Sequence, residues 1–175
     1  DDGKGIDVLD IKTGLVVNAI LPDKEIETIA IDEQKKILAA AGERKLHIVS
    51  TDTLGILKSI SIGEEPVSLA IDSDLGLALV THEEDRVTVI DLNAYKILTE
   101  IKVSKKPVSS AVDPGLRLAV IAHKTWGKDD NNVTIIDLNT FAIVKTLQAG
   151  KNPRHVTINP NTHQAVIANE KSNDL

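Results

Sequence analysis

Short apolar runs separated by polar turn residues recur along the whole chain. Residues 66–103 contain four such runs, PVSLAID, LALVTH, VTVIDL and KILTEIKV. The runs are rich in β-branched side chains, are bounded by Gly, Asp, Asn or Pro, and are too short for stable helices. An apolar period of 3.6 residues, which would indicate helices, is missing. The pattern therefore predicts an all-β protein.

Several of these predicted strands are apolar on both faces. In the third run, Val89 and Ile90 point to opposite sides of a strand, and Leu92 continues the apolar segment. A strand of this kind is covered on both sides, whereas a half-solvated strand alternates apolar and polar positions. The predicted sheets should therefore pack face to face.

The chain repeats itself in one register. The segment RVTVIDLNAYKI at 86–97 returns as NVTIIDLNTFAI at 132–143. Three sets of landmarks follow the same spacings of 40, 41 and 46 residues. The sets are Asp10, Ser50, Asp91 and Asp137; Asp32, Asp72, Asp113 and Asn159; and, ten residues beyond the second set, Gly42, His82, His123 and Asn169. Independently of these, Pro66, Pro107 and Pro153 repeat 41 and 46 residues apart, with Glu25 at the position of the first repeat. Agreement among three landmarks indicates a true internal repeat.

Four strands in each period of about 40 residues are typical of the blades of a β-propeller. We therefore predict a β-propeller array of four-stranded antiparallel blades over residues 1–175, with about four blades' worth of strands. The expected parts are a half-blade at 6–21, blades at about 26–62, 66–103 and 107–149, and a half-blade at 153–169.

The repeats resemble the YVTN-type β-propeller family, which includes surface-layer-type propellers. The family's second-strand motif stands here as LVTH (79–82), VIAH (120–123) and VIAN (166–169), and it degenerates to AAAG in the first repeat. The Tyr of the motif is replaced by aliphatic residues. The resemblance implies a propeller fold, rings larger than four blades, and an extracellular, periplasmic or cell-surface location.

The two half-blades leave three arrangements open. The chain could close on itself as a four-bladed ring, or two chains could combine their half-blades into an eight-bladed ring. Alternatively, the chain could be part of a longer propeller, which the size of the family's rings favours. Unpaired strand edges are expected to be covered by self-association or by further sequence.

Composition narrows the possible partners. The net charge is -6 and the 20 Lys and Arg residues are scattered, so no nucleic-acid partner is expected. No apolar run approaches the roughly 20 residues that span a bilayer. Cysteine is absent, which excludes disulfides and thiolate metal sites. No cofactor motif is present, and we expect no cofactor.

Loops of varied length are expected on one face of the propeller, which we call the loop-rich face. It should carry the segments GEEP, SKKP, GKNP, GERK, HEEDR, HKTWGKDDN and NEKSND. Binding sites are usually built from such loops on a rigid scaffold. The longest segment supplies these candidate partner-binding residues: His123, Lys124, Trp126, Lys128, Asp129 and Asp130. Alternatively, Trp126 covers the edge of a neighbouring blade.

Histidines provide further candidates. His82 and His123 occupy equivalent repeat positions and are weak candidates for a metal site, although a polar side chain there can also bond the turn backbone. Arg154 and His155 are expected near the funnel of the ring, where they could bind an anionic group or take part in acid–base chemistry. No dedicated metal site is predicted.

The sequence favours a non-catalytic binding or scaffold module that engages a protein or a glycan through its loop-rich face. One alternative is a lactonase-like hydrolase with His123, Arg154 and His155 around the funnel. A second alternative is a structural repeat of a surface layer or appendage. Fold alone does not separate these functions.

Overall fold

A computed structural model describes residues 5–21, 24–124 and 132–170. Throughout these ranges the regular structure is β-strand, and no helix there could cross a bilayer. The predicted all-β, four-stranded antiparallel propeller architecture is confirmed.

The N-terminal half-blade consists of β1 (Ile6–Asp10) and β2 (Leu15–Ile20). The first blade consists of β3 (Thr28–Asp32), β4 (Ile37–Gly42), β5 (Lys45–Ser50) and β6 (Ile56–Ser61). The second blade consists of β7 (Pro66–Asp72), β8 (Leu77–His82), β9 (Arg86–Asp91) and β10 (Lys96–Lys102). The third blade consists of β11 (Pro107–Asp113), β12 (Leu118–His123), β13 (Asn132–Asp137) and β14 (Ile143–Gln148). The C-terminal half-blade consists of β15 (Pro153–Asn159) and β16 (Gln164–Asn169).

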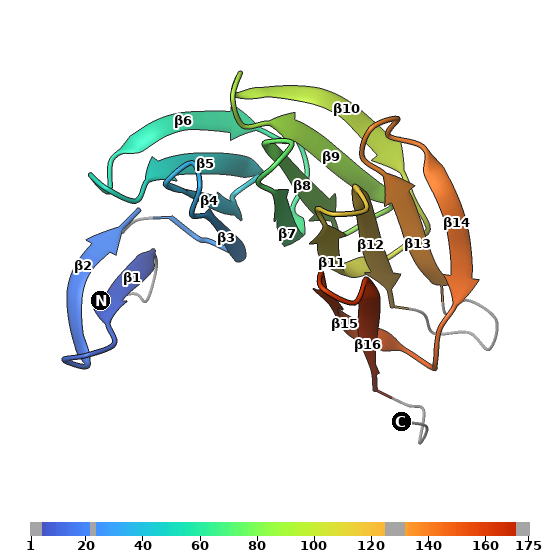
Figure 1. Ribbon diagram of the computed structural model, residues 1–175. Helices are drawn as coiled ribbons and strands as arrows, with labels where there is room; N and C mark the ends of the chain where they lie inside the picture. Colours follow the sequence, from blue (N-terminus) through green and yellow to red (C-terminus); the bar gives the residue numbers. More distant parts are fainter. Residues whose placement is uncertain (1–4, 22–23, 125–131, 171–175) are drawn as a thin grey trace.

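Each complete blade is an antiparallel meander whose four strands pair in chain order. The first strands of successive blades, β3, β7, β11 and β15, are neighbours on the inner side of an open arc (Figure 1). The strands β6, β10 and β14 lie on its outer side, and the two half-blades stand at its ends as separate two-stranded sheets. The arrangement places all connections between blades on one face.

Two of the sequence landmarks are turn caps. Asp91 Oδ1 accepts hydrogen bonds from the backbone N–H groups of Asn93 and Ala94, at 2.7 and 3.0 Å. Asp137 does the same in the next blade. Asp72 Oδ1 accepts from the backbone of Leu75 in the turn between β7 and β8. Side chains of this type stabilise tight turns by replacing a backbone acceptor, which explains why the acidic positions repeat.

The turn between β11 and β12 requires a left-handed residue. Arg117 has φ 57° there, and the equivalent residue of the second blade is Gly76, with φ 66°. A side chain in this conformation brings its Cβ close to the following carbonyl oxygen, at a cost of roughly 1–2 kcal/mol. The third blade therefore forms this turn with local backbone strain at Arg117.

Replacement of Arg117 by glycine should relieve this strain. We expect Arg117→Gly to be more stable than Arg117→Ala by about 1 kcal/mol, because both remove the long side chain but only glycine accepts the left-handed backbone. Urea unfolding followed by circular dichroism measures the difference. Equal midpoints for the two variants would contradict the assignment of strain to this backbone.

Aliphatic side chains fill the spaces between blades. Leu79 and Val89 of the second blade pack with Ile121 and Ile136 of the third, and all four are completely buried. Because alternate residues of one strand face opposite neighbours, a central blade is apolar on both sides. The same packing joins the half-blades to the blades beside them.

At the third set of landmark positions, which includes Gly42, His82 and His123, the histidine side chains fill space beneath the loop-rich face. In the second and third blades His82 and His123 are completely buried there. In the first blade Gly42 occupies this position, and a Cβ added to it would lie 1.9 Å from the backbone oxygen of Glu25 and 2.8 Å from Cα of Ile26. The segment before β3 thus occupies the volume that the imidazole fills elsewhere. The degenerate AAAG motif reflects this close backbone approach.

Candidate functional site

A cavity of about 860 Å³ opens on the loop-rich face between the second and third blades. Its apolar part is formed by Val67 of β7 and by Pro107 and Val108 of β11. The remaining lining residues are charged and come from the loops after β8, β10 and β12 and from the start of β15. The cavity therefore extends over two complete blades and the C-terminal half-blade.

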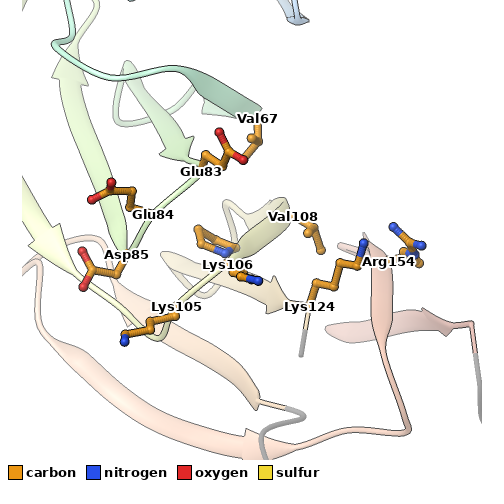
Figure 2. A pocket seen from close by; sticks show the side chains of 10 residues that line it. Val67, Glu83, Glu84, Asp85, Lys105, Lys106, Val108, Lys124 and Arg154 are labelled. Atoms are coloured by element: carbon orange, nitrogen blue, oxygen red, sulfur yellow. The ribbon is translucent and has the colours of Figure 1, made fainter. Parts of the chain in front are cut away.

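The charged lining is divided by sign. Figure 2 shows Glu83, Glu84 and Asp85 on one side of the cavity and Lys124 and Arg154 on the opposite side. These acidic residues follow β8. Of the two lysines in the segment SKKP, Lys106 lies between these two groups and Lys105 lies beside Asp85 (Figure 2). A ligand in the cavity would thus meet opposite charges on its two sides.

Acidic side chains continue from this cavity over the first two blades. Two smaller hollows beside it are lined mainly by glutamates, with Arg44 among them. The glutamates are Glu25, Glu27, Glu43, Glu64, Glu65, Glu83 and Glu84. Glutamates are therefore concentrated on the loop-rich face over the first two blades, where Glu43, Glu64 and Glu65 form ion pairs with Lys24, Arg86 and Arg44.

Ion pairs at the rim partly compensate these charges. Arg154 donates to Oε2 of Glu170 from Nε and Nη2, at 2.7 and 2.6 Å. Lys102 lies 3.5 Å from Asp85. Exposed pairs of this kind contribute little to stability, and a charged partner can compete with them. The pairs orient the side chains without closing the cavity.

Backbone hydrogen bonds make the loops around the cavity rigid. Lys106 N–H donates to the Glu84 carbonyl at 2.7 Å, and Lys124 N–H donates to the Lys106 carbonyl at 2.8 Å. Val103 N–H donates to the Asp85 carbonyl at 2.8 Å. These bonds connect three loops in succession. A preorganised cavity of this kind loses less entropy when a ligand binds.

The candidate His123 lies beneath the loops and not in the cavity. Its Nε2 is 2.8 Å from Thr134 Oγ1, and the equivalent His82 Nε2 is 2.7 Å from Thr88 Oγ1. Nδ1 of His82 also lies 3.3 Å from the carbonyl oxygen of Glu64. The imidazole of His82 thus connects two strands and the loop backbone, and that of His123 connects two strands.

Burial keeps these imidazoles neutral. Removal from water lowers the pKa of His123 from 6.5 to about 4, and the backbone of Ser104 and Lys105 only partly opposes this shift. Burial also lowers the pKa of His82. In the described ranges no three His, Cys, Asp or Glu side chains are grouped so that they could bind a metal ion. The histidines are organised as core hydrogen-bonding groups.

The candidates Arg154 and His155 point to different surroundings. Arg154 lines the cavity, together with the candidate Lys124. His155 Nδ1 lies 3.2 Å from Ser109 Oγ, and that hydroxyl also accepts the backbone N–H of Val156 at 3.1 Å. His155 therefore contributes to the contact between the inner strands β11 and β15.

The remaining candidates, Trp126, Lys128, Asp129 and Asp130, lie outside the described residues. The cavity is also lined by residues that are not among the candidates from the sequence, chiefly Glu83, Glu84, Asp85, Lys105 and Lys106. The sequence places the segments HEEDR and SKKP on the loop-rich face, but only the packed structure shows that they line one cavity. The signal in the sequence that could have identified these residues is the opposite charge of consecutive loops, acidic in HEEDR and basic in SKKP.

Comparisons with known proteins support the fold. The sequence matches no protein-family model and no curated protein. Among solved structures, Kuenenia stuttgartiensis hydrazine synthase superposes with a TM-score of 0.76 and 20% identity, over 85% of this chain and 43% of that chain. The structure of U3-55K gives a TM-score of 0.69 and 10% identity, over 83% of this chain and 52% of that chain.

The crystal structure of the RRP9 WD40 repeats also superposes with a TM-score of 0.69 and 10% identity, over 83% of this chain and 51% of that chain. The chain thus spans about half the length of these structures. WD40 repeats form β-propellers, and 1205 solved chains match in all. Because one fold supports many functions, these likenesses identify propeller architecture and not an activity.

Proposed function

We propose that this protein is a non-catalytic β-propeller module that binds a partner protein or glycan through its loop-rich face. The observation that carries the proposal is the 860 Å³ cavity with acidic and basic sides. Its loops are held by backbone hydrogen bonds between the second and third blades. Such a preformed concave surface with a few charged groups has the character of a recognition site.

The charge distribution favours a protein segment over a neutral glycan. A neutral sugar that filled the cavity would remove water from Glu84 and Lys105 without supplying opposite charges. A polypeptide segment with both a basic and an acidic side chain would match both sides. Complementary charges of this kind increase the association rate and select against wrong partners.

We further propose that the repeats are of the YVTN type and that the protein acts outside the cytoplasm. The segments LVTH, VIAH and VIAN support the first proposal. The second rests on the family resemblance. Immunogold labelling of thin sections of the source organism tests it, because gold particles confined to the cytoplasm would contradict the proposal.

Reversal of one basic charge at the cavity should weaken binding. We expect Lys105→Glu to weaken the affinity for ligands selected from a peptide-display library roughly tenfold or more, because it removes a positive charge from the cavity lining and adds a negative one. The matched control is Lys145→Glu, which makes the same charge change at an exposed position of β14. Surface plasmon resonance with the selected peptides, and an array of defined oligosaccharides, supply the measurements.

Two results would contradict this function. Equal loss of affinity in Lys105→Glu and Lys145→Glu would show that only net charge matters. Lactone hydrolysis by the wild-type protein that disappears in His155→Ala would instead favour a catalytic propeller. Selected peptides that carry both signs of charge, and lose affinity only in Lys105→Glu, support the proposal.

A further inference from the structure

The cavity between the second and third blades continues into a hollow over the first two blades. Val67 and Glu83 line both spaces, which therefore adjoin each other. Figure 2 shows these two side chains next to each other at the edge of the cavity. The hollow has a volume of about 430 Å³. We call the cavity and the hollow together the inner groove.

The apolar part of the inner groove repeats from blade to blade. Pro66 and Val67 begin β7, and Pro107 and Val108 begin β11. All four residues line the groove; the prolines are buried and the valines are half-buried. Proline is accepted as the first residue of a strand, where its missing N–H is not needed. Each of these inner strands thus presents one aliphatic side chain to a ligand.

The end of the inner groove over the first two blades is acidic. Five glutamates line the hollow there: Glu25, Glu27, Glu43, Glu65 and Glu83. Two of them, Glu43 and Glu65, form ion pairs with Lys24 and Arg44, at 3.1 and 2.9 Å. The other three form no ion pair with any side chain of the described ranges. Their carboxylates therefore favour a cationic group in the hollow.

The end of the inner groove at the C-terminal half-blade is basic. The proline that begins β15 is followed by Arg154, where the two preceding inner strands have valine. Arg154 lies with Lys124 opposite the acidic residues of the cavity (Figure 2). Glu170 accepts hydrogen bonds from Nε and Nη2 of Arg154. Nη1 of a guanidinium carries further N–H groups, which can bind a second carboxylate.

Backbone groups of the loops beside the groove are already paired. Glu83 N–H donates to the Glu65 carbonyl at 3.2 Å, and Lys106 N–H donates to the Glu84 carbonyl at 2.7 Å. These N–H groups are not available to the main chain of a ligand. Recognition at these loops must therefore use side chains, so the order of the ligand's side chains should decide its affinity.

We propose that the inner groove binds a polypeptide segment with basic side chains at one end, aliphatic side chains in the middle and acidic side chains at the other end. The basic end lies over the hollow, the aliphatic part lies on Val67 and Val108, and the acidic end lies at Lys124 and Arg154. This inference rests on the proposed function and adds the order of side chains in the partner. A segment placed the other way round brings like charges together at both ends, which the groove selects against.

Reversal of one charge in the hollow tests the position of the basic end. Peptides selected on the wild-type protein from a library of random linear peptides should carry the proposed order. Glu27→Lys should weaken their affinity roughly tenfold or more, because it places a cation beside the basic end of the ligand. The matched control is Glu33→Lys, which makes the same charge change at an exposed position at the opposite end of β3. Isothermal titration calorimetry measures the affinities.

A compensating change in the peptide locates the contact. The basic residues of a selected peptide are replaced by glutamate one at a time. At one position the replacement should weaken binding to the wild type but restore affinity for Glu27→Lys, because the two reversed charges again attract each other. With Glu33→Lys no position should give this restoration. Circular dichroism verifies that each variant is folded, and Glu25→Lys, in the same hollow, replaces Glu27→Lys if the latter fails to fold.

The outcomes separate this inference from the proposed function. Unchanged affinity in Glu27→Lys, together with a loss in Lys105→Glu, would leave a peptide-binding cavity but overturn a ligand that extends over the hollow. Purely additive effects of the protein and peptide changes would overturn the order of charges. Binding of oligosaccharides without binding of peptides would overturn the inference while the proposed function stands, and binding of neither would overturn both.

Discussion

Replacing Gly42 with alanine is expected to lower the free energy of unfolding by about 3 kcal/mol, since overpacking of a closed site costs this much when backbone must move. The added Cβ would lie 1.9 Å from the Glu25 backbone oxygen and 2.8 Å from Cα of Ile26. No rotation of a side chain can relieve a contact with main-chain atoms. Urea unfolding at neutral pH measures the loss.

Gly55→Ala is the matched control for this substitution. An added Cβ at Gly55 would meet only Thr53 Oγ1, at 3.4 Å, which is an ordinary contact. We expect this variant to differ from the wild type by less than about 0.5 kcal/mol, as is usual at surface positions. Equal destabilisation of the two variants would show that Gly42 is not closed in by the segment before β3.

Acidification from pH 6.5 to pH 4 should destabilise the protein by about 3 kcal/mol through His123 alone, since one unit of pKa difference corresponds to about 1.4 kcal/mol. The folded-state pKa of His123 is lowered from 6.5 to about 4 by burial. Between these two values the unfolded chain binds a proton that the folded chain does not bind. Stability therefore falls as the pH falls through this window and levels off below it.

The variant His123→Asn separates this contribution from other acid effects. Asparagine does not titrate, and Asn169 already occupies the equivalent position in the C-terminal half-blade. We expect a smaller slope of unfolding free energy against pH than in the wild type, although His82, whose pKa is also lowered by burial, keeps part of the slope. The slope against pH is compared, and not the unfolding free energy at one pH, because the smaller asparagine side chain also changes the packing and so lowers stability at every pH. Parallel curves for variant and wild type would contradict the assignment to His123.

The propeller architecture could be predicted because its signals are local. Asp91 and Asp137 repeat because each caps a turn within a few residues of itself. Apolar residues on both faces of a short strand indicate that neighbouring sheets cover it, whichever sheets these are. Both properties are visible in a single period of the sequence.

For the candidate site, the sequence predicts only the face of the propeller on which it lies. Assignment of the segments HEEDR and SKKP to the loop-rich face follows from strand order alone. That Glu84 and Lys105 line one cavity depends on how the second and third blades pack. The position of His123 likewise depends on packing, since the strand end that carries it could present the ring to solvent or to the core.

The sequence by itself determined the number and order of the strands, the turns between them and the identity of the half-blades, because these depend on contacts between residues close in the chain. Only the tertiary structure decided the curvature of the arc, the burial of His82 and His123, the close approach at Gly42 and the two-sided cavity. These features depend on the angle between neighbouring blades, to which many small side-chain volumes contribute together. No single repeat contains that information.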